Sequence, residues 1–349
     1  MISQTIINWY FNNKRDLPWR DTIDPYKVWI SEIILQQTRV NQGINYYYRF
    51  IESFPDIFSL ANAEIDHVLK LWQGLGYYSR ARNMHETAKY IVNYYNGVFP
   101  TEYTDLVKLK GIGEYTAAAI ASFCFNAGIP VIDGNVFRVL SRIFGITEST
   151  QSASGKKIFK EKAHEIIDKK QAHIFNQAIM EFGALQCIPK NPDCTVCPLK
   201  EYCFAFNNQM VIDLPAKKIK VNQSNRFFSY IYIIYKNTTF IEKRTADDIW
   251  KMLYQIPLIE TQEVVGIHKL SETELWNKLF DKTEITLNSP TLHKTHILSH
   301  QKLNCTFYKI QINKPGDYIR NHYIQIPVKE INKYSIPRVL DWYFGKINQ

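Results

Sequence analysis

The chain has few cysteines for its length and no hydrophobic run long enough to cross a membrane. Six of its 349 residues are cysteine, and only Cys124 and Cys305 lie outside residues 187–203. No stretch of about 18 apolar residues is present, and the N-terminus lacks the basic start and apolar core of a signal peptide. Internal repeats and low-complexity tracts are missing too. These features argue against a disulfide-built secreted domain, so we expect an intracellular, cytoplasmic protein.

Acidic residues are outnumbered by basic ones. The chain has 42 Lys and Arg against 33 Asp and Glu, a net charge of +9 and a pI near 9.0. Basic side chains that neutralise phosphates release counterions, so this balance fits a polyanionic partner. Hydrophobic residues make up 46% and charged residues 21%, which is typical of a globular chain. Its length predicts at least two domains.

Four cysteines cluster with the spacing C-x6-C-x2-C-x5-C: Cys187, Cys194, Cys197 and Cys203. Four thiolates satisfy either a tetrahedral zinc ion or a [4Fe–4S] cluster. Structural zinc sites usually pair two short knuckles, whereas only the central two cysteines are so close here. The longer outer spacings favour the larger iron–sulfur core. We therefore predict a loop wrapped around a [4Fe–4S] cluster, with zinc or four unrelated thiols as the alternatives.

The spacing of apolar residues divides the chain into a helical part and a mixed part. Residues up to about 205 have helical periodicity, and Asp24 and Pro25 begin a run through 24–54 that predicts one long helix. Residues 207–225 are polar and non-periodic, which predicts a linker. After it, β-branched and aromatic residues predict a hairpin turning at Lys236–Asn237, a helix over 271–280 and a strand over 303–312. The expected fold is multidomain and mainly α, with a C-terminal α+β domain.

The segment LKGIGEYTAAAI places Gly111 and Gly113 between two helical stretches. Glycines let the backbone turn tightly and bring the N–H groups of a helix start close to an anion. This pattern predicts a helix-hairpin-helix that grips a phosphate, although a G-x-G pair also occurs in ordinary helical hairpins.

Glu32 is the first candidate for chemistry. It lies in the predicted long helix, with Gln36 and Arg39 at helical spacing in a polar strip. One interpretation is a surface carboxylate paired with arginine. The other is a partly desolvated carboxyl with a raised pKa, which donates a proton near neutral pH.

Asp133 is the second candidate. It precedes Gly134 and Asn135 and is predicted to be the N-cap of a helix over Val136–Phe144, where the helix dipole favours an ionised carboxylate. Glycosidic bonds are cleaved through an oxocarbenium-like transition state by one carboxylic acid and one carboxylate in different surroundings. Glu32 and Asp133 fit these two positions.

Seven stretches in the same order resemble the MutY-type adenine DNA glycosylases, relatives of endonuclease III in the helix-hairpin-helix superfamily. They are LPWR (17–20), PYKVWISEIILQQTRV (25–40), LWQGLGYYSRARN (71–83), LKGIGEYTAAAI (109–120), VIDGNVFRVLSRIF (131–144), FNQAIMEFGALQC (175–187) and the cysteine loop. Several long motifs in one order make the resemblance specific. It implies a catalytic domain over 1–206, with a six-helix barrel at about 15–128 and an iron–sulfur part at about 1–14 and 129–206.

The resemblance also implies site residues. Glu32 would be the general acid at adenine N7, and Asp133, beside Asn135, the ion stabiliser or nucleophile. The adenine pocket would be lined by Trp19, Arg20 and Gln177, and the base stack would be wedged by Gln37 and Tyr77. The cluster would be structural, and Lys190 and Lys200 in its loop would either meet phosphates or be ordinary solvated lysines.

The implied partner is double-stranded DNA with adenine mispaired with 8-oxoguanine or guanine, bound by a nucleoid-associated monomer that flips the adenine out. Tyr115 stands where endonuclease III-like enzymes carry the lysine that attacks the sugar and cleaves the strand. Because tyrosine cannot form a Schiff base, we expect a monofunctional glycosylase that leaves an abasic site. The alternatives are a bifunctional pyrimidine-lesion glycosylase and a non-catalytic iron–sulfur DNA-binding protein. The presence of both Glu32 and Asp133 argues against the non-catalytic protein.

Residues 226–349 resemble the nudix-like domain that inspects the base opposite adenine. The acidic R-E-x-x-E-E helix that holds magnesium in nudix hydrolases is missing, which argues against nucleotide hydrolysis. Residues 295–310 resemble the loop that reads 8-oxoguanine, with Ser299 and His300 as its hydrogen-bonding residues. Leu298 replaces the aromatic residue usual there, and a structural role is the alternative for His300.

Overall fold

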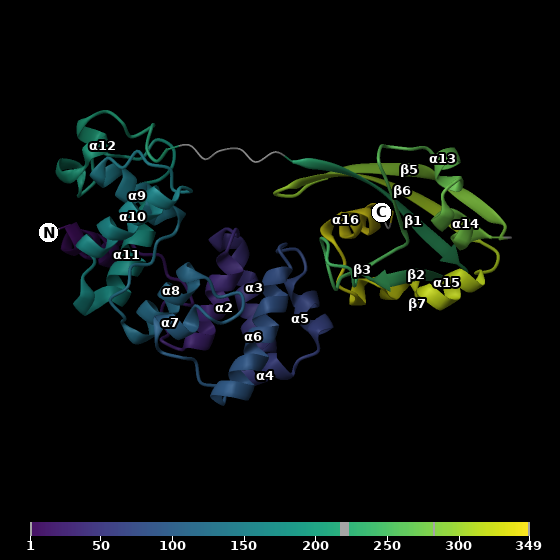
Figure 1. Ribbon diagram of the computed structural model, residues 1–349, viewed down its shortest axis with the longest axis horizontal. Coiled ribbons are helices and arrows are strands. Elements are labelled where there is room, and N and C mark those ends of the chain that lie inside the picture. The colour runs from purple at the N-terminus through teal and green to yellow at the C-terminus, as the bar shows by residue number, and fades with distance from the viewer. Residues whose placement is uncertain (1, 217–222, 282, 348–349) are drawn as a thin grey trace. The chain divides into compact units, whose positions relative to one another are not determined.

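The helices predicted from apolar periodicity form the first of two units in the computed structural model, which describes residues 2–216, 223–281 and 283–347 (Figure 1). This unit combines the chain up to Asn62 with the stretch that begins at Asn83 and precedes the linker. The second unit combines Ala63–Arg82 with the C-terminal part. The division differs from the expected boundaries, which assigned residues 63–82 to the first domain.

In its described residues, the first unit consists of helices and connecting loops and has no strands. Its helices are α1 (Ile2–Asn13), α2 (Pro25–Leu35), α3 (Val40–Ser53), α4 (Ile57–Asn62), most of α6 (Ser79–Tyr95), α7 (Tyr103–Leu106), α8 (Glu114–Phe125), α9 (Gly134–Phe144), α10 (Ala153–Ile166), α11 (Ala172–Leu185) and α12 (Phe204–Asn207). Short 3-10 turns cover Lys169–Gln171 and Lys200–Tyr202. Helix α11 packs against α1, α8 and α9, and α2 packs against α3 and α8.

The long helix predicted over 24–54 is wrong, because the structure divides it into α2 and α3. Asp24 caps α2 as expected, with its side chain accepting from the Tyr26 N–H and with Pro25 at the first position. The chain then turns at Gln37, whose φ of 57° is left-handed and ends the helix. Apolar residues on both sides of the break keep the same period, so the pattern alone concealed the turn.

The G-x-G segment forms the turn between α7 and α8. Gly111 has a φ of 76°, and a Cβ added there would lie 2.7 Å from the Cβ of Asn83, so this position requires glycine. Gly113 is the N-cap of α8 with an ordinary φ of −85° and open space around it. The first N–H groups of α8 have no partner within the helix, which leaves them available to an anion.

The second unit is built on a seven-stranded sheet with the order β3-β2-β1-β6-β5, to which β4 adds beside β1 and β7 beside β2. The strands are β1 (Ser224–Tyr235), β2 (Thr238–Lys243), β3 (Tyr254–Gln255), β4 (Leu258–Thr261), β5 (Ile285–Ile297), β6 (Gln301–Ile312) and β7 (Ile324–Pro327). Strands β1 and β6 are parallel, and the other pairs are antiparallel. The predicted hairpin is confirmed, since Tyr235 pairs with Thr238 across the Lys236–Asn237 turn.

Helices cover both faces of this sheet. Alternate residues of β1 point to opposite sides: Tyr230 and Tyr232 join the core with α16 (Arg338–Ile347), and Ile231 and Ile233 join the core on the other face. That second core includes residues of α13 (Ile267–Ser271), α14 (Glu274–Phe280) and α15 (Asp317–His322). The unit also holds α5 (Ile65–Trp72) and the 3-10 segment Val328–Lys333.

The expected linker is shorter than residues 207–225. The chain stays attached to the first unit through Leu214, which is 3% exposed and whose carbonyl accepts from Arg142 Nε at 3.1 Å. Strand β1 already begins at Ser224, and residues 217–222 lie outside the described residues. No helix in the described part of the chain combines the length and apolar character that a bilayer span needs.

Candidate active site

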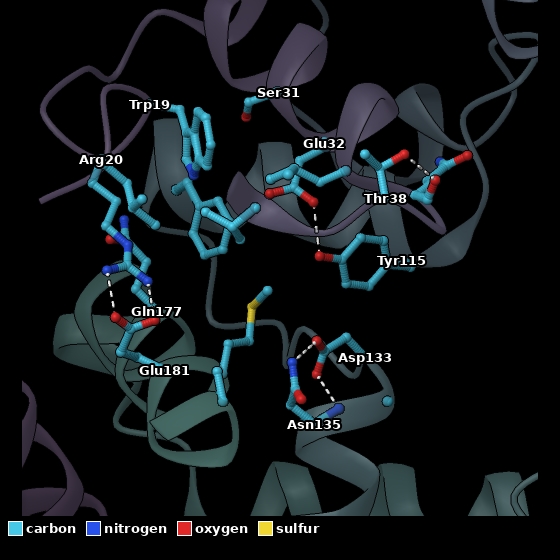
Figure 2. A pocket seen from close by; sticks show the side chains of 18 of the residues that line it. Trp19, Arg20, Ser31, Glu32, Thr38, Tyr115, Asp133, Asn135, Gln177 and Glu181 are labelled. Atoms are coloured by element: carbon cyan, nitrogen blue, oxygen red, sulfur yellow. Dashed lines mark hydrogen bonds and ion pairs between the residues drawn. The ribbon is translucent and has the colours of Figure 1, made fainter. Parts of the chain in front are cut away.

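A cavity of about 420 Å³ in the first unit collects most of the residues that the sequence proposes for chemistry. Its volume lies within the range of roughly 300–1,000 Å³ of small-molecule sites. Eight predicted residues line it: Trp19, Arg20, Glu32, Gln37, Tyr115, Asp133, Asn135 and Gln177. They come from α2, α8, α9, α11 and the adjoining loops, so segments far apart in the sequence build one site (Figure 2).

Glu32 is a buried carboxyl, which contradicts the interpretation as a surface residue paired with Arg39. Its side chain is 6% exposed, and Tyr115 donates its hydroxyl hydrogen to Oε2 at 2.7 Å. Burial raises the pKa of Glu32 to about 7, and the nearby charge of Asp133 also raises it, against the Tyr115 hydrogen bond. Arg39 instead precedes α3 on the exposed side of the turn. At neutral pH this carboxyl can hold or release a proton.

Asp133 is the N-cap of α9, as predicted, and it faces the same cavity. Its Oδ1 accepts the backbone N–H groups of Asn135 and Val136, each at 2.8 Å, and Oδ2 accepts Asn135 Nδ2 at 2.8 Å. Burial raises the pKa of Asp133, although these hydrogen bonds and Arg138 oppose the shift. The sequence predicted the effect of the helix dipole, which favours the ionised carboxylate, but not the burial, which acts in the opposite direction.

The wall opposite the acids is held by an ion cluster that the sequence reasoning missed. Glu181 is 1% exposed and accepts hydrogen bonds from Arg15 and Arg20, both at 2.6 Å to Oε2. Burial would raise the pKa of Glu181, but the bonds from the two arginines outweigh it and bring the pKa down to about 2. The cluster fixes the Arg20 guanidinium at the cavity wall (Figure 2). The signal was available, since Glu181 lies one helical turn after Gln177.

Gln177 and Trp19 provide an amide and a flat ring to the cavity. Gln177 Oε1 accepts the Tyr10 hydroxyl at 2.9 Å, which orients its amide group. Trp19 is 9% exposed and makes an edge contact with Tyr47, with ring centroids 5.4 Å apart. Ser31, from α2, lines the cavity as well and was not anticipated.

Gln37 lies at the rim of this cavity. Its backbone is left-handed in the α2–α3 turn, and its side chain is exposed. The turn is closed by the Thr38 N–H, which donates to the Leu35 carbonyl at 3.1 Å. An exposed side chain on a rigid turn suits the predicted insertion into a base stack, which stays a prediction.

Three predicted residues lie together in the second unit. A cavity of about 510 Å³ is lined by Tyr77, Ser299 and His300, and the Tyr77 hydroxyl hydrogen-bonds Ser299 Oγ. Ser299 and His300 occupy the tight turn between β5 and β6, closed by the Leu298 N–H donating to the Gln301 carbonyl at 2.8 Å. The His300 side chain is exposed, which does not fit the alternative of a structural histidine.

The four clustered cysteines line one small cavity together with Arg142 of α9. Arg142 Nη1 lies 3.4 Å from Cys187 Sγ. Burial, followed by the charges of Cys187 and Cys203, raises the pKa of the Cys194 thiol, which reflects how near these sulfurs lie to one another. In the described part of the chain, no three His, Cys, Asp or Glu side chains converge on a position for a single metal ion. Lys190 and Lys200 are exposed on the loop.

Helices, hairpin and cavity together define a DNA glycosylase of the helix-hairpin-helix class. Residues 30–168 match the HhH-GPD superfamily of base excision DNA repair proteins, and residues 229–344 match the NUDIX domain. A thermostable thymine-DNA glycosylase is similar in structure, with a TM-score of 0.54 and 27% identity over 59% of this chain and 95% of that one. Endonuclease III in a complex with DNA shares the fold, with a TM-score of 0.52 at 21% identity over 60% of this chain and 95% of that one.

The chain belongs to the adenine DNA glycosylase family. It is 38% identical over 323 residues to the adenine DNA glycosylase of Buchnera aphidicola subsp. Baizongia pistaciae, covering 91% of this chain and 88% of the relative. The human enzyme of the same name is 41% identical over 210 residues, which cover 58% of this chain and 38% of that protein. The predicted family is thereby confirmed, and so are the helix-hairpin-helix and nudix-like parts of the predicted fold class, while the iron–sulfur loop stays a prediction.

Proposed function

We propose that the protein is a monofunctional base excision repair enzyme that hydrolyses the N-glycosidic bond of adenine mispaired with 8-oxoguanine or guanine. One observation carries the proposal: a buried carboxyl with a pKa of about 7, Glu32, shares a cavity with the capping carboxylate Asp133. The two groups titrate in different surroundings, which supplies an acid and a charge stabiliser. Membership of the adenine DNA glycosylase family supports adenine as the base that is removed.

The reaction begins with protonation of the flipped adenine. Glu32 donates its proton to adenine N7, the C1′–N9 bond breaks, and its electron pair leaves with the base. Asp133 stabilises the positive charge that develops on the sugar. Water then adds to C1′ and its proton returns to the Glu32 carboxylate, so that an abasic site remains and the enzyme is restored.

The adenine itself is held by Trp19, Arg20 and Gln177. The Trp19 ring offers a stacking surface, and the Gln177 amide offers hydrogen bonds to the purine edge. Arg20 is already paired with Glu181, so its charge is compensated before a neutral base arrives. The positions of these side chains around one cavity support this assignment (Figure 2).

The base opposite adenine is read in the second unit. Ser299 and His300, exposed at the tip of the β5–β6 turn, offer a hydroxyl and an imidazole to the edge of 8-oxoguanine. Tyr77 lines the same cavity and has a φ of 47°, so its ring stands on a strained, exposed turn. Gln37 and Tyr77 are the proposed wedges, and phosphates are gripped at the start of α8.

Cys187, Cys194, Cys197 and Cys203 are the proposed ligands of a [4Fe–4S] cluster. All four thiols line one cavity, they are soft ligands suited to iron and sulfide, and the Arg142 guanidinium beside Cys187 offsets their negative charge. A bound cluster would hold Cys187, which follows α11, together with the three cysteines of the loop, and its role would be structural. Lys190 and Lys200 are then presented to the DNA backbone.

The proposed function is tested with a duplex that contains adenine opposite 8-oxoguanine. After incubation with the protein, half of the sample is treated with alkali. Strand breaks only after alkali are the expected result, because an abasic site survives until base treatment. Breaks without alkali would identify a lyase, and DNA binding without breaks in either half would identify a non-catalytic protein.

Tyr115→Lys should convert part of the activity to strand cleavage. The new amine would stand next to Glu32, attack C1′ as adenine leaves with its bonding electrons, and form a Schiff base that opens the route to strand scission. Trapping with borohydride reduces the imine and leaves protein covalently attached to DNA. Tyr115→Phe is the matched control and should give no trapped complex; a blank trap with lysine would contradict the placement of residue 115.

Cys197→Ser should abolish the visible absorbance of the iron–sulfur cluster and lower the iron and sulfide content, because one of four ligands is lost. The protein should also melt at a lower temperature. Cys124→Ser is the control, since Cys124 lies in α8 away from the cysteine loop. Unchanged iron content in the Cys197 variant would contradict the ligand assignment.

A further inference from the structure

We propose that Trp250 is a stacking surface for the base opposite the excised adenine, an inference that rests on the proposed function. Trp250 lines the second unit's cavity together with Tyr77, Ser299 and His300. It lies in the loop that connects β2 to β3. Three observations carry the proposal: backbone strain, a clamp of ion pairs and a fixed ring.

The backbone of this loop is strained. Trp250 has a φ of 60° and Met252 a φ of 70°. Bulky side chains rarely adopt this left-handed conformation, which costs about 1–3 kcal/mol per residue and persists only where the surroundings impose it. Two such residues within three positions indicate that the loop is held in this shape against its own preference.

A clamp of ion pairs imposes the shape. Asp248, two residues before Trp250, is bound by Arg226 at 2.7 Å and by Arg244 at 2.8 Å. Arg244 also donates to the Ile249 carbonyl at 3.0 Å, and its carbonyl accepts the Met252 N–H at 2.7 Å. On the other side of the loop, Leu253 is fully buried in the core. The loop is therefore rigid, and the Asp248 charge is neutralised where it lines the cavity.

The Trp250 ring is held by two neighbouring rings. Phe228 meets it edge-on, with centroids 6.3 Å apart, and His296 lies 5.9 Å away at 57°. A rigid, partly exposed indole beside polar Ser299 and His300 suits a planar base, because stacking uses the base's face while hydrogen bonds use its edge. Leu298 provides no ring at the turn, whereas Trp250 adds a flat aromatic surface to the lining of the same cavity.

The test measures binding by the full-length protein in a Glu32→Gln background, so that the adenine stays in place. Three duplexes carry adenine opposite 8-oxoguanine, guanine or a stable abasic analogue. Trp250→Leu keeps apolar packing and removes the ring, and Trp250→Phe restores a ring. Trp342→Leu is the matched control, because Trp342 packs against the same core and does not line the cavity.

Trp250→Leu should weaken binding to both purine-containing duplexes by about tenfold, the size expected for losing one base stack. Binding to the abasic duplex should not change, Trp250→Phe should recover most of the affinity, and Trp342→Leu should affect all three duplexes equally or not at all. An equal loss on the abasic duplex, or no loss on any, overturns the inference. Adenine excision by the unsubstituted protein is measured in parallel: its absence would refute the proposed function, whereas normal excision with an unaffected Trp250 variant would refute only the stacking role.

Discussion

Glu32→Gln should reduce the rate of adenine excision by about 10²- to 10⁴-fold, the usual contribution of a general acid. Glutamine has nearly the same shape and can still accept the Tyr115 hydroxyl, so the cavity should keep its form. It cannot donate a proton of suitable acidity to N7. The variant should therefore still bind mismatched duplex. Single-turnover rates measured with saturating enzyme separate the loss of chemistry from any loss of DNA binding.

The same substitution should stabilise the fold at alkaline pH. Burial raises the pKa of Glu32 from 4.5 to about 7, so the folded state resists ionisation of this group. The penalty is absent below the unfolded pKa, grows as the pH rises from 4.5 to about 7, and is complete above that, where it reaches roughly 3 kcal/mol. Glutamine removes it, so urea unfolding should show a gain at high pH and almost none at acidic pH.

The control for Glu32→Gln is Glu165→Gln, which removes an exposed carboxylate paired with Lys162. It should change neither the excision rate nor the stability at either pH by a measurable amount. Near-normal turnover of the Glu32 variant would remove Glu32 from the acid role. Loss of DNA binding together with turnover would instead point to a damaged cavity.

Asp133→Asn should lower the excision rate by about 10²- to 10³-fold, because a neutral amide cannot balance the charge that develops on the sugar. Asparagine caps helices as well as aspartate does, so α9 should persist. One hydrogen bond is lost, because the amide nitrogen that replaces Asp133 Oδ2 would face Asn135 Nδ2, which is also a donor. The Asn135 amide stays in this orientation because its Oδ1 accepts a hydrogen bond from Arg138. The expected cost in stability is therefore only about 1 kcal/mol.

Asp24→Asn is the matched control for Asp133→Asn. Asp24 caps α2 through the same kind of bond, to the Tyr26 N–H at 2.9 Å, but it does not line the cavity. It should show a similarly small change in melting temperature and unaltered excision. Equal losses of activity in the two variants would mean that Asp133 acts only by holding its helix.

Sequence patterns predicted the helix starts and the hairpin turn, which depend on interactions between residues close together in the chain. Asp24 before Pro25, Asp133 before α9 and the two-residue turn at Lys236–Asn237 each satisfy or redirect backbone hydrogen bonds within a few residues, and the structure has all three. The break at Gln37 was missed because apolar residues keep their period across it. The left-handed backbone of Gln37 goes with the packing of α2 against α3, and the intrinsic preference of glutamine does not predict it.

The sequence was sufficient to predict which residues form the site, but not how deeply they are buried or which hydrogen bonds they make. Sequence motifs named Glu32, Tyr115 and Asp133, but burial decides how Glu32 and Asp133 titrate, and burial depends on contacts between distant segments. The hydrogen bond from Tyr115 to Glu32 joins residues 83 positions apart. The helical spacing from Gln177 could have pointed to Glu181, but its pairing with Arg15 and the strained loop at Trp250 depend on contacts between distant segments.

The pH dependence of single-turnover adenine excision tests the acid role of Glu32 most directly. The rate should be high on the acidic side, where Glu32 is protonated, and should fall about tenfold per pH unit above an apparent pKa of about 7. In the Glu32→Gln variant the residual rate should lose this dependence. A profile that stays flat across neutrality in the unsubstituted protein, or the same fall in the glutamine variant, would contradict proton donation by Glu32.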